Sequence, residues 1–226
     1  MVRTPPIWAL VALLAVVAVG CARPEGEARA PRIYETCASC HGDDGEGNEE
    51  FGAPAIAGME LWYLQRQLEK FRDGHRGADP EDYQGLRMRA MVRTLDPVGR
   101  VEEPRAEGEE PQSSNIEAIA TYVSAMPAVT PEATLDGDPE RGRTLYATCV
   151  ECHGENAAGN QERDAPRLTG LNDWYIVAQL TKFKAGDRGT TPGDETGATM
   201  RPMALGLANE RAMADVAAYI ATLRGQ

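Results

Sequence analysis

The sequence contains the stretch Cys37-Ala-Ser-Cys40-His41-Gly42 and, further along, the stretch Cys149-Val-Glu-Cys152-His153-Gly154. They are separated by an offset of 112 residues (149 minus 37). Two cysteines with two residues between them, followed directly by a histidine, form the attachment signature of c-type haem: the thiols add to the porphyrin vinyl groups and the histidine binds iron. The sequence therefore predicts two covalent haem c groups. The attaching residues are Cys37, Cys40, Cys149 and Cys152, and the iron ligands are His41 and His153.

Two other chemistries use paired cysteines, and the sequence context disfavours both. Two Cys-x-x-Cys pairs that share one zinc ion usually lie about 15 to 20 residues apart, whereas Cys40 and Cys149 are separated by 109 residues (149 minus 40). A redox-active dithiol of the thioredoxin type belongs to a βαβ unit, and the surrounding sequence has no convincing strand-like alternation. Haem attachment accounts for the cysteines and for the adjacent histidine.

The offset of 112 residues extends far beyond the two motifs and indicates a duplication. It relates Tyr34 to Tyr146, Pro54 to Pro166, Trp62 to Trp174, Gln67 to Gln179, Phe71 to Phe183, Arg76 to Arg188, Met88 to Met200, and Met91 to Met203. Towards the end of each copy the offset falls to 97, so the first copy holds 15 additional residues (112 minus 97). The acidic, proline-containing segment 101–114 is predicted to be this inserted, solvated loop. We expect two homologous domains, 32–130 and 131–226, with the boundary between Pro127 and Pro139.

Both copies follow the same helical plan, which predicts an all-α fold. A short helix runs into each cysteine pair, and in the second copy Asp138, Pro139 and Glu140 provide an N-cap, a first-position proline and a first-turn acid. A middle helix is expected in each copy, from Leu61 to about Asp73 and from Asn172 to about Ala185, with Gly74 and Gly186 as the C-terminal stops. A last helix is expected from about Asn115 to Ala125 and from about Asn209 to Leu223.

The sixth iron ligand is restricted by the histidine count. The chain has three histidines, and only His75 lies outside the motifs; its counterpart is Asp187, so we expect a surface residue. Methionine is the remaining soft ligand. Met88 and Met200 each lie 47 residues after a motif histidine (88 minus 41, and 200 minus 153), and each is followed three residues later by Met91 or Met203. The recurrence favours ligation by one methionine of each pair.

These motifs resemble those of the diheme class I cytochromes c, and within them the cytochrome c4 group of tandem-duplicated periplasmic electron carriers. The resemblance covers about Pro31 to the C-terminus and includes both haem motifs, two Pro-containing loops, the Tyr-x-x-x-Gln-Leu segments and the terminal Ala-x-Tyr. It implies two tandem class I domains, Met88 and Met200 as axial ligands, and packing of Met91 and Met203 in the core. It also implies that the Pro54 and Pro166 carbonyls accept the Nδ1 hydrogens of His41 and His153.

The resemblance extends to the contact between the first and last helices of each domain. Tyr34 with Tyr122, and Tyr146 with Tyr219, are placed for an aromatic contact at this crossing. The family's small residue there is Gly142 in the second copy, whereas the first copy has Ala30. We therefore expect a looser crossing in the first domain.

The N-terminus predicts export. Arg3 precedes an apolar run of thirteen residues, 7–19, which suits a signal peptide covering residues 1–20 and is too short to span a bilayer. Ala18-Val19-Gly20-Cys21 resembles a lipoprotein cleavage site. We expect Cys21 to carry a lipid and residues 21–31 to tether the protein to the periplasmic side of a bacterial membrane; without acylation it would be soluble in the periplasm.

Charge and iron ligation together indicate an electron carrier. The net charge of −12 argues against nucleic acid as a partner, and the charge is −9 over 32–130 and −4 over 131–226. This acidity serves solubility or steers a basic partner. An iron with two protein ligands has no open position for a substrate, so we expect transfer between a quinol-oxidising complex and a terminal oxidase or other periplasmic acceptor. The alternatives are an electron-relay subunit of a larger dehydrogenase or respiratory complex, and a diheme enzyme such as a peroxidase.

Overall fold

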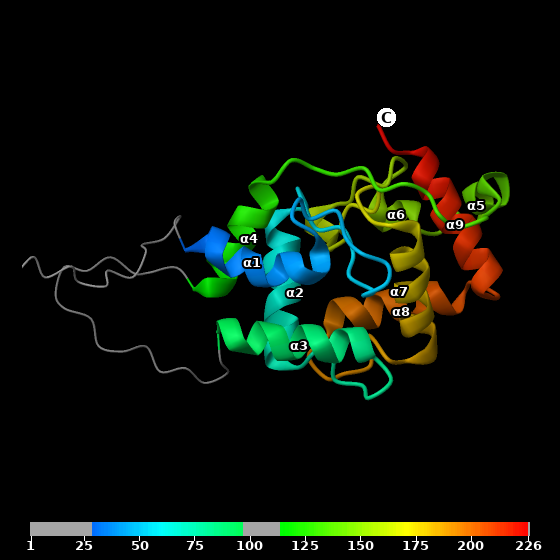
Figure 1. Ribbon diagram of the computed structural model, residues 1–226. Helices are drawn as coiled ribbons and strands as arrows, with labels where there is room; N and C mark the ends of the chain where they lie inside the picture. The colour runs from blue at the N-terminus through cyan, green and yellow to red at the C-terminus, as the bar shows by residue number, and fades with distance from the viewer. Residues whose placement is uncertain (1–28, 97–113, 226) are drawn as a thin grey trace, which may run out of the picture.

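The computed structural model describes residues 29–96 and 114–225, and within them the fold is built from helices joined by loops (Figure 1). In chain order they are α1 (Ala30–His41), α2 (Leu61–Asp73), α3 (Tyr83–Leu95), α4 (Asn115–Ala125), α5 (Pro139–Tyr146), α6 (Val150–His153), the 3-10 helix η2 (Gln161–Arg163), α7 (Asp173–Ala185), α8 (Glu195–Leu205) and α9 (Glu210–Thr222). The only extended pairings in these ranges are two isolated bridges, Asn48 with Ala53 and Asn160 with Ala165.

The predicted signal peptide, Cys21, most of the tether and all of the acidic insertion except Ser114 lie outside the described residues. Across the described ranges, none of the helices has both the length and the apolar character needed to cross a membrane.

Most helices form where the sequence predicts them. α2 and α4 have the expected limits, α7 begins one residue later than expected, α9 is one residue shorter than expected at each end, and α5 begins at Pro139. Asp138 caps α5 by accepting hydrogen bonds from the backbone N–H groups of Glu140 and Arg141 at 3.0 and 3.2 Å. A cap of this kind supplies acceptors to backbone groups that have no partner within the helix.

Two α-helices were not expected from the sequence, and each carries one of the methionine pairs. α3 contains Met88 and Met91, and α8 contains Met200 and Met203. α8 encloses Pro202, a residue that normally argues against a helix interior. Both helices begin after an aspartate that accepts a hydrogen bond from the residue three positions on: Asp82 from Gly85, and Asp194 from Gly197. The Asp-x-x-Gly pattern is the feature of the sequence that marks the start of both helices.

The first and last helices of each half pack together as expected. The ring centroids of Tyr34 and Tyr122 lie 5.5 Å apart, and those of Tyr146 and Tyr219 lie 5.4 Å apart. At Gly142 an added Cβ would lie 1.9 Å from the Asp215 carbonyl oxygen, so only glycine permits the close approach of α5 to α9. The α1–α4 contact is less extensive than the α5–α9 contact, in agreement with the looser crossing expected in the first domain.

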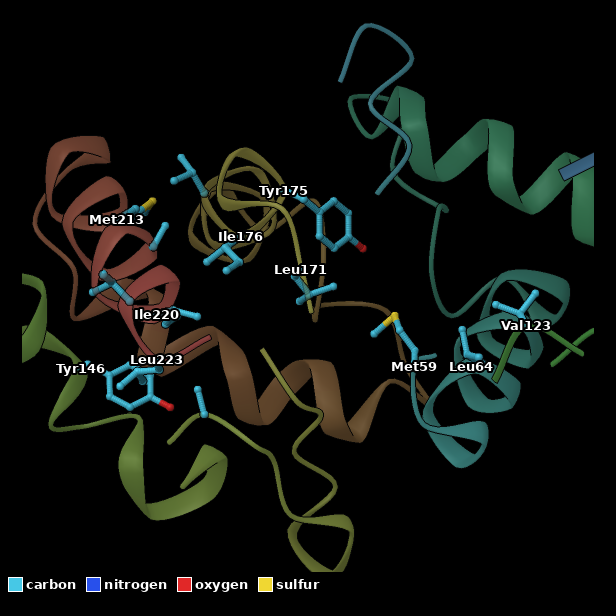
Figure 2. Packing of buried hydrophobic residues seen from close by; sticks show 14 of the residues in the cluster. Met59, Leu64, Val123, Tyr146, Leu171, Tyr175, Ile176, Met213, Ile220 and Leu223 are labelled. Atoms are coloured by element: carbon cyan, nitrogen blue, oxygen red, sulfur yellow. The ribbon is translucent and has the colours of Figure 1, made fainter. Parts of the chain in front are cut away.

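The two halves contribute to one shared hydrophobic cluster, beside which the first half has a smaller cluster of its own, Phe71, Val92 and Ile116. Met59, Leu64 and Val123 come from the first half, and Leu171, Tyr175 and Ile220 from the second (Figure 2). Burial of apolar side chains contributes roughly 25 cal/mol per Å² removed from water. This shared burial stabilises the arrangement of the domains relative to each other.

The segment that joins α4 to α5 is fixed to the second domain by Asp173. Its carboxylate accepts hydrogen bonds from the backbone N–H groups of Thr134 and Leu135 at 2.6 and 2.8 Å, and from the Thr134 hydroxyl at 3.1 Å. Burial alone would raise the pKa of Asp173, but the hydrogen bonds from Leu135 and Thr134 outweigh that effect and lower the pKa. The charged carboxylate is therefore the form that holds the connecting segment.

Replacing Asp173 by asparagine should lower the free energy of unfolding by about 1–3 kcal/mol at neutral pH, because buried donors lose a charged acceptor. A group whose pKa is depressed in the folded state stabilises the fold above its unfolded pKa of about 3.9 and loses that contribution as the pH falls through its folded pKa. In denaturant titrations, the stability difference between the wild type and D173N should therefore begin to shrink as the pH falls below about 4. A difference that stays constant from pH 7 to pH 3 would contradict this role.

Candidate haem sites

Each Cys-x-x-Cys-His motif lies at the end of a helix. Cys37, Cys40 and His41 occupy the last turns of α1, which ends at His41. In the second half, Cys149 directly precedes the short helix α6, which ends at His153. The helical path brings each cysteine pair and its histidine to the same helix end, as simultaneous attachment to one porphyrin and its iron requires.

A proline carbonyl orients each motif histidine. Nδ1 of His41 lies 2.8 Å from the Pro54 carbonyl oxygen, and Nδ1 of His153 lies 2.8 Å from the Pro166 carbonyl oxygen. Because a carbonyl only accepts, each Nδ1 carries the hydrogen and each Nε2 retains its lone pair. These are the contacts that the family resemblance implies.

The protonation state of both histidines suits iron binding. Both rings are buried, with exposed fractions of 6% for His41 and 5% for His153. Burial lowers the pKa of each ring, and the hydrogen bond to the proline carbonyl only partly opposes this effect. A neutral imidazole that donates through Nδ1 is the form that ligates a metal through Nε2.

The cysteines have the properties of thiols that are consumed in attachment rather than of a redox-active pair. Within the described residues the four motif cysteines form no disulfide. Burial raises the pKa of Cys37 to about 11 and also raises the pKa of Cys149. Reactive dithiols show a lowered thiol pKa, so this alternative does not fit either motif.

The methionine pairs divide into an inner and an outer member. Met88 packs against the buried cluster of Phe71, Val92 and Ile116, and Met200 is half-buried. Met91 and Met203 are 43% and 44% exposed. The expected core packing of Met91 and Met203 is therefore wrong: in α3, Val92 follows Met88 by four residues and takes the buried face. Ligation by Met88 and Met200 stays a prediction.

His75 is less peripheral than expected. It is half-buried, and its Nδ1 lies 3.0 Å from the carbonyl oxygen of Pro192 in the second half. The position past the end of α2 was correctly placed, but the neighbouring domain covers part of the ring.

Two arginines between the domains were not identified as site residues from the sequence. Arg76 donates to Gln67 at 2.8 Å, to Tyr175 at 2.8 Å and to Gln179 at 3.1 Å. Arg188 donates to the same two glutamines, Gln179 at 2.8 Å and Gln67 at 3.1 Å. The two arginines and the two glutamines are each related by the 112-residue offset, so the network has approximate twofold symmetry.

This arginine pair fits the presence of haem. Arg76 is only 8% exposed, and among the described residues neither guanidinium has a carboxylate partner and neither buried Nε has a hydrogen-bond acceptor. Buried charges in proteins are normally paired. Haem brings two carboxylates, so it supplies the kind of anion that these guanidinium groups lack.

The comparisons with known proteins agree with the site. A family model described as "Cytochrome c" matches residues 27–127 and 139–224. A thiosulfate dehydrogenase electron acceptor of Thiomonas intermedia is 30% identical, covering 83% of this chain and 80% of its own. The solved cytochrome c4 of Acidithiobacillus ferrooxidans is 25% identical with a TM-score of 0.63, covering 84% of this chain and 99% of its own. A solved thiosulfate dehydrogenase of Marichromatium purpuratum is 31% identical with a TM-score of 0.63, covering 86% of this chain, which spans 40% of that one.

The chain thus belongs to the cytochrome c family. It is a diheme class I cytochrome, similar in sequence and structure to cytochrome c4, and its two tandem cytochrome c domains each bind one covalent haem c. Its function is electron transfer. Haem supplies an iron that alternates between two oxidation states; the chain supplies the thiols, the oriented histidines and a buried environment. The expected fold class, cofactor and electron-transfer role are confirmed.

The inner methionine of each pair should be the ligand that spectroscopy detects. Substitution of Met88 or Met200 by alanine should remove the sulfur-to-iron charge-transfer band of one haem in the oxidised holoprotein, because the thioether that gives rise to it is lost. Met91→Ala and Met203→Ala are matched controls on the same helices and should leave both bands in place. Loss of a band in either control instead would assign the outer methionine as ligand.

Proposed function

We propose that this diheme cytochrome is a membrane-tethered periplasmic carrier that takes electrons from a quinol-oxidising complex and delivers them to a terminal oxidase or another periplasmic acceptor. The observation that carries the proposal is the pair of buried, carbonyl-bound histidines, His41 and His153, in two joined domains. With Met88 and Met200 as second ligands, each iron is closed by the chain, and outer-sphere electron transfer is the chemistry that remains.

The surface of the first domain supports a partner with a basic docking face. The loop 42–53, which leads from His41 to Pro54, contains five acidic residues and no basic residue, whereas its counterpart 154–165 contains three acidic residues and Arg163. Phe51 and Tyr83 are 41% and 65% exposed, and their counterparts are Arg163 and Glu195. Charge complementarity of this kind raises association rates and is weakened by salt.

The membrane tether rests on the N-terminal sequence. Acylation of Cys21 would leave eight residues, 22–29, between the lipidated cysteine and α1, which begins at Ala30. A flexible segment of that length would span roughly 16 Å, which would keep the first domain close to the bilayer and to membrane-bound partners.

A second candidate is service as the electron acceptor of a particular dehydrogenase. It is favoured by the relative named a thiosulfate dehydrogenase electron acceptor, which matches most of this chain. In that role the donor would be the dehydrogenase, and the same haem sites would receive its electrons.

Rapid-mixing measurements can separate these roles from each other and from catalysis. Membranes that hold a quinol-oxidising complex and a terminal oxidase should reduce and then reoxidise both haems of the purified holoprotein. Peroxide consumption should not exceed that of a buffer blank, because neither iron has an open position. Faster reduction by thiosulfate with a thiosulfate dehydrogenase than by the membranes would favour the second candidate, and sustained peroxide turnover would refute the carrier role.

Fractionation tests the tether. The mature wild-type protein should sediment with membranes and remain there at high salt, because acyl-chain insertion does not depend on charge. Cys21→Ser should be released into the soluble periplasmic fraction while keeping both haems. Release of the wild type together with C21S would show that no lipid anchors the chain.

A further inference from the structure

The domain interface contains two ion pairs that are related by the internal repeat. Lys70 of α2 donates to the Asp194 carboxylate and, at 2.5 Å, to the Thr196 hydroxyl. Lys182 of α7 donates to the Asp82 carboxylate at 2.5 Å and to the Gln84 amide oxygen at 2.9 Å. The offset of 112 relates Lys70 to Lys182 and Asp82 to Asp194. In each pair, the lysine of one domain therefore binds an aspartate of the other domain.

Both pairs are shielded from water. The side-chain exposed fractions are 12% and 2% for Lys70 and Asp194, and 14% and 3% for Lys182 and Asp82. Exposed ion pairs contribute little, but removing one partner of a buried pair leaves an uncompensated charge, and that is strongly destabilising. These two contacts therefore constrain the backbone around each aspartate.

Each aspartate also starts a helix that carries a candidate iron ligand. Asp194 accepts a hydrogen bond from the Gly197 backbone N–H at 3.1 Å and lies six residues before Met200. Asp82 accepts from the Gly85 backbone N–H at 2.9 Å and lies six residues before Met88. A single carboxylate thus joins the first turn of a methionine helix to a lysine of the opposite domain.

We propose that Lys70 and Lys182 are positioning residues that act across the interface: Lys70 holds the helix of Met200, and Lys182 holds the helix of Met88. The inference rests on the proposed ligation by these methionines. Without its lysine, the buried carboxylate would move towards water and draw the first helical turn with it, because desolvating an unpaired charge is costly. The haem of one domain therefore depends on a side chain of the other.

The test is the effect of Lys70→Met and Lys182→Met on each haem separately. In the oxidised holoprotein, the methyl signals of the two ligating methionines are shifted by the paramagnetic iron, and the M88A and M200A variants assign them. Added imidazole is the probe, because it competes with a thioether for ferric iron. K70M should strengthen imidazole binding about tenfold at the haem of Met200 only, the size expected for loss of a buried contact worth about 1.4 kcal/mol.

K182M should produce the mirror result at the haem of Met88. Arg72→Met is the matched control, because Arg72 lies on α2 near Lys70 but pairs with Asp73 of its own domain at 2.7 Å. Lys70→Arg should restore most of the wild-type behaviour, and K70Q takes the place of K70M if that variant does not accumulate as holoprotein. An effect in the lysine's own domain, an equal effect at both haems, or no effect would overturn the proposal. If M88A and M200A leave both methyl signals in place, the ligand assignment fails instead.

Discussion

The hydrogen bond from Nδ1 of each motif histidine to a proline carbonyl is the interaction on which the rest of the site depends. It fixes the ring, selects the tautomer and leaves Nε2 available to iron. It also ties the end of α1 or α6 to the loop that follows it, so the loop and the haem-attaching helix form one unit. Burial lowers the pKa of both rings, which keeps them in the neutral form that a metal requires.

The contact between the two domains is polar as well as apolar. The shared hydrophobic cluster fixes how the domains meet. Arg76 and Arg188 place two positive charges at that contact without carboxylate partners among the described residues. Such a cationic centre would attract haem carboxylates and would favour the reduced form of a nearby haem.

Sequence reasoning was strongest where covalent chemistry or periodicity dictates the answer. The haem motifs, the repeat, α2, α4, α7 and α9 follow from residue spacing and helix-end residues. It missed α3 and α8, because Gly85, Gly197 and Pro202 weaken the helical signal, and the capping aspartates were not considered. The prediction that Met91 and Met203 pack in the core was also wrong. Residues three apart on a helix do not point in the same direction, so the helix has to be placed before one can tell which methionine faces inward. Arg76 and Lys70 could not be assigned roles, because their partners lie about a hundred residues away and depend on how the domains meet.

The central claim is that both irons are closed by one histidine and one methionine, which makes the protein a carrier. The most direct test is the electron paramagnetic resonance spectrum of the oxidised wild-type holoprotein, integrated against its haem content and read together with the sulfur-to-iron charge-transfer band. The account predicts two low-spin haems per chain, each with a sulfur ligand. A high-spin signal from either haem, or a charge-transfer band that accounts for only one of them, would contradict it.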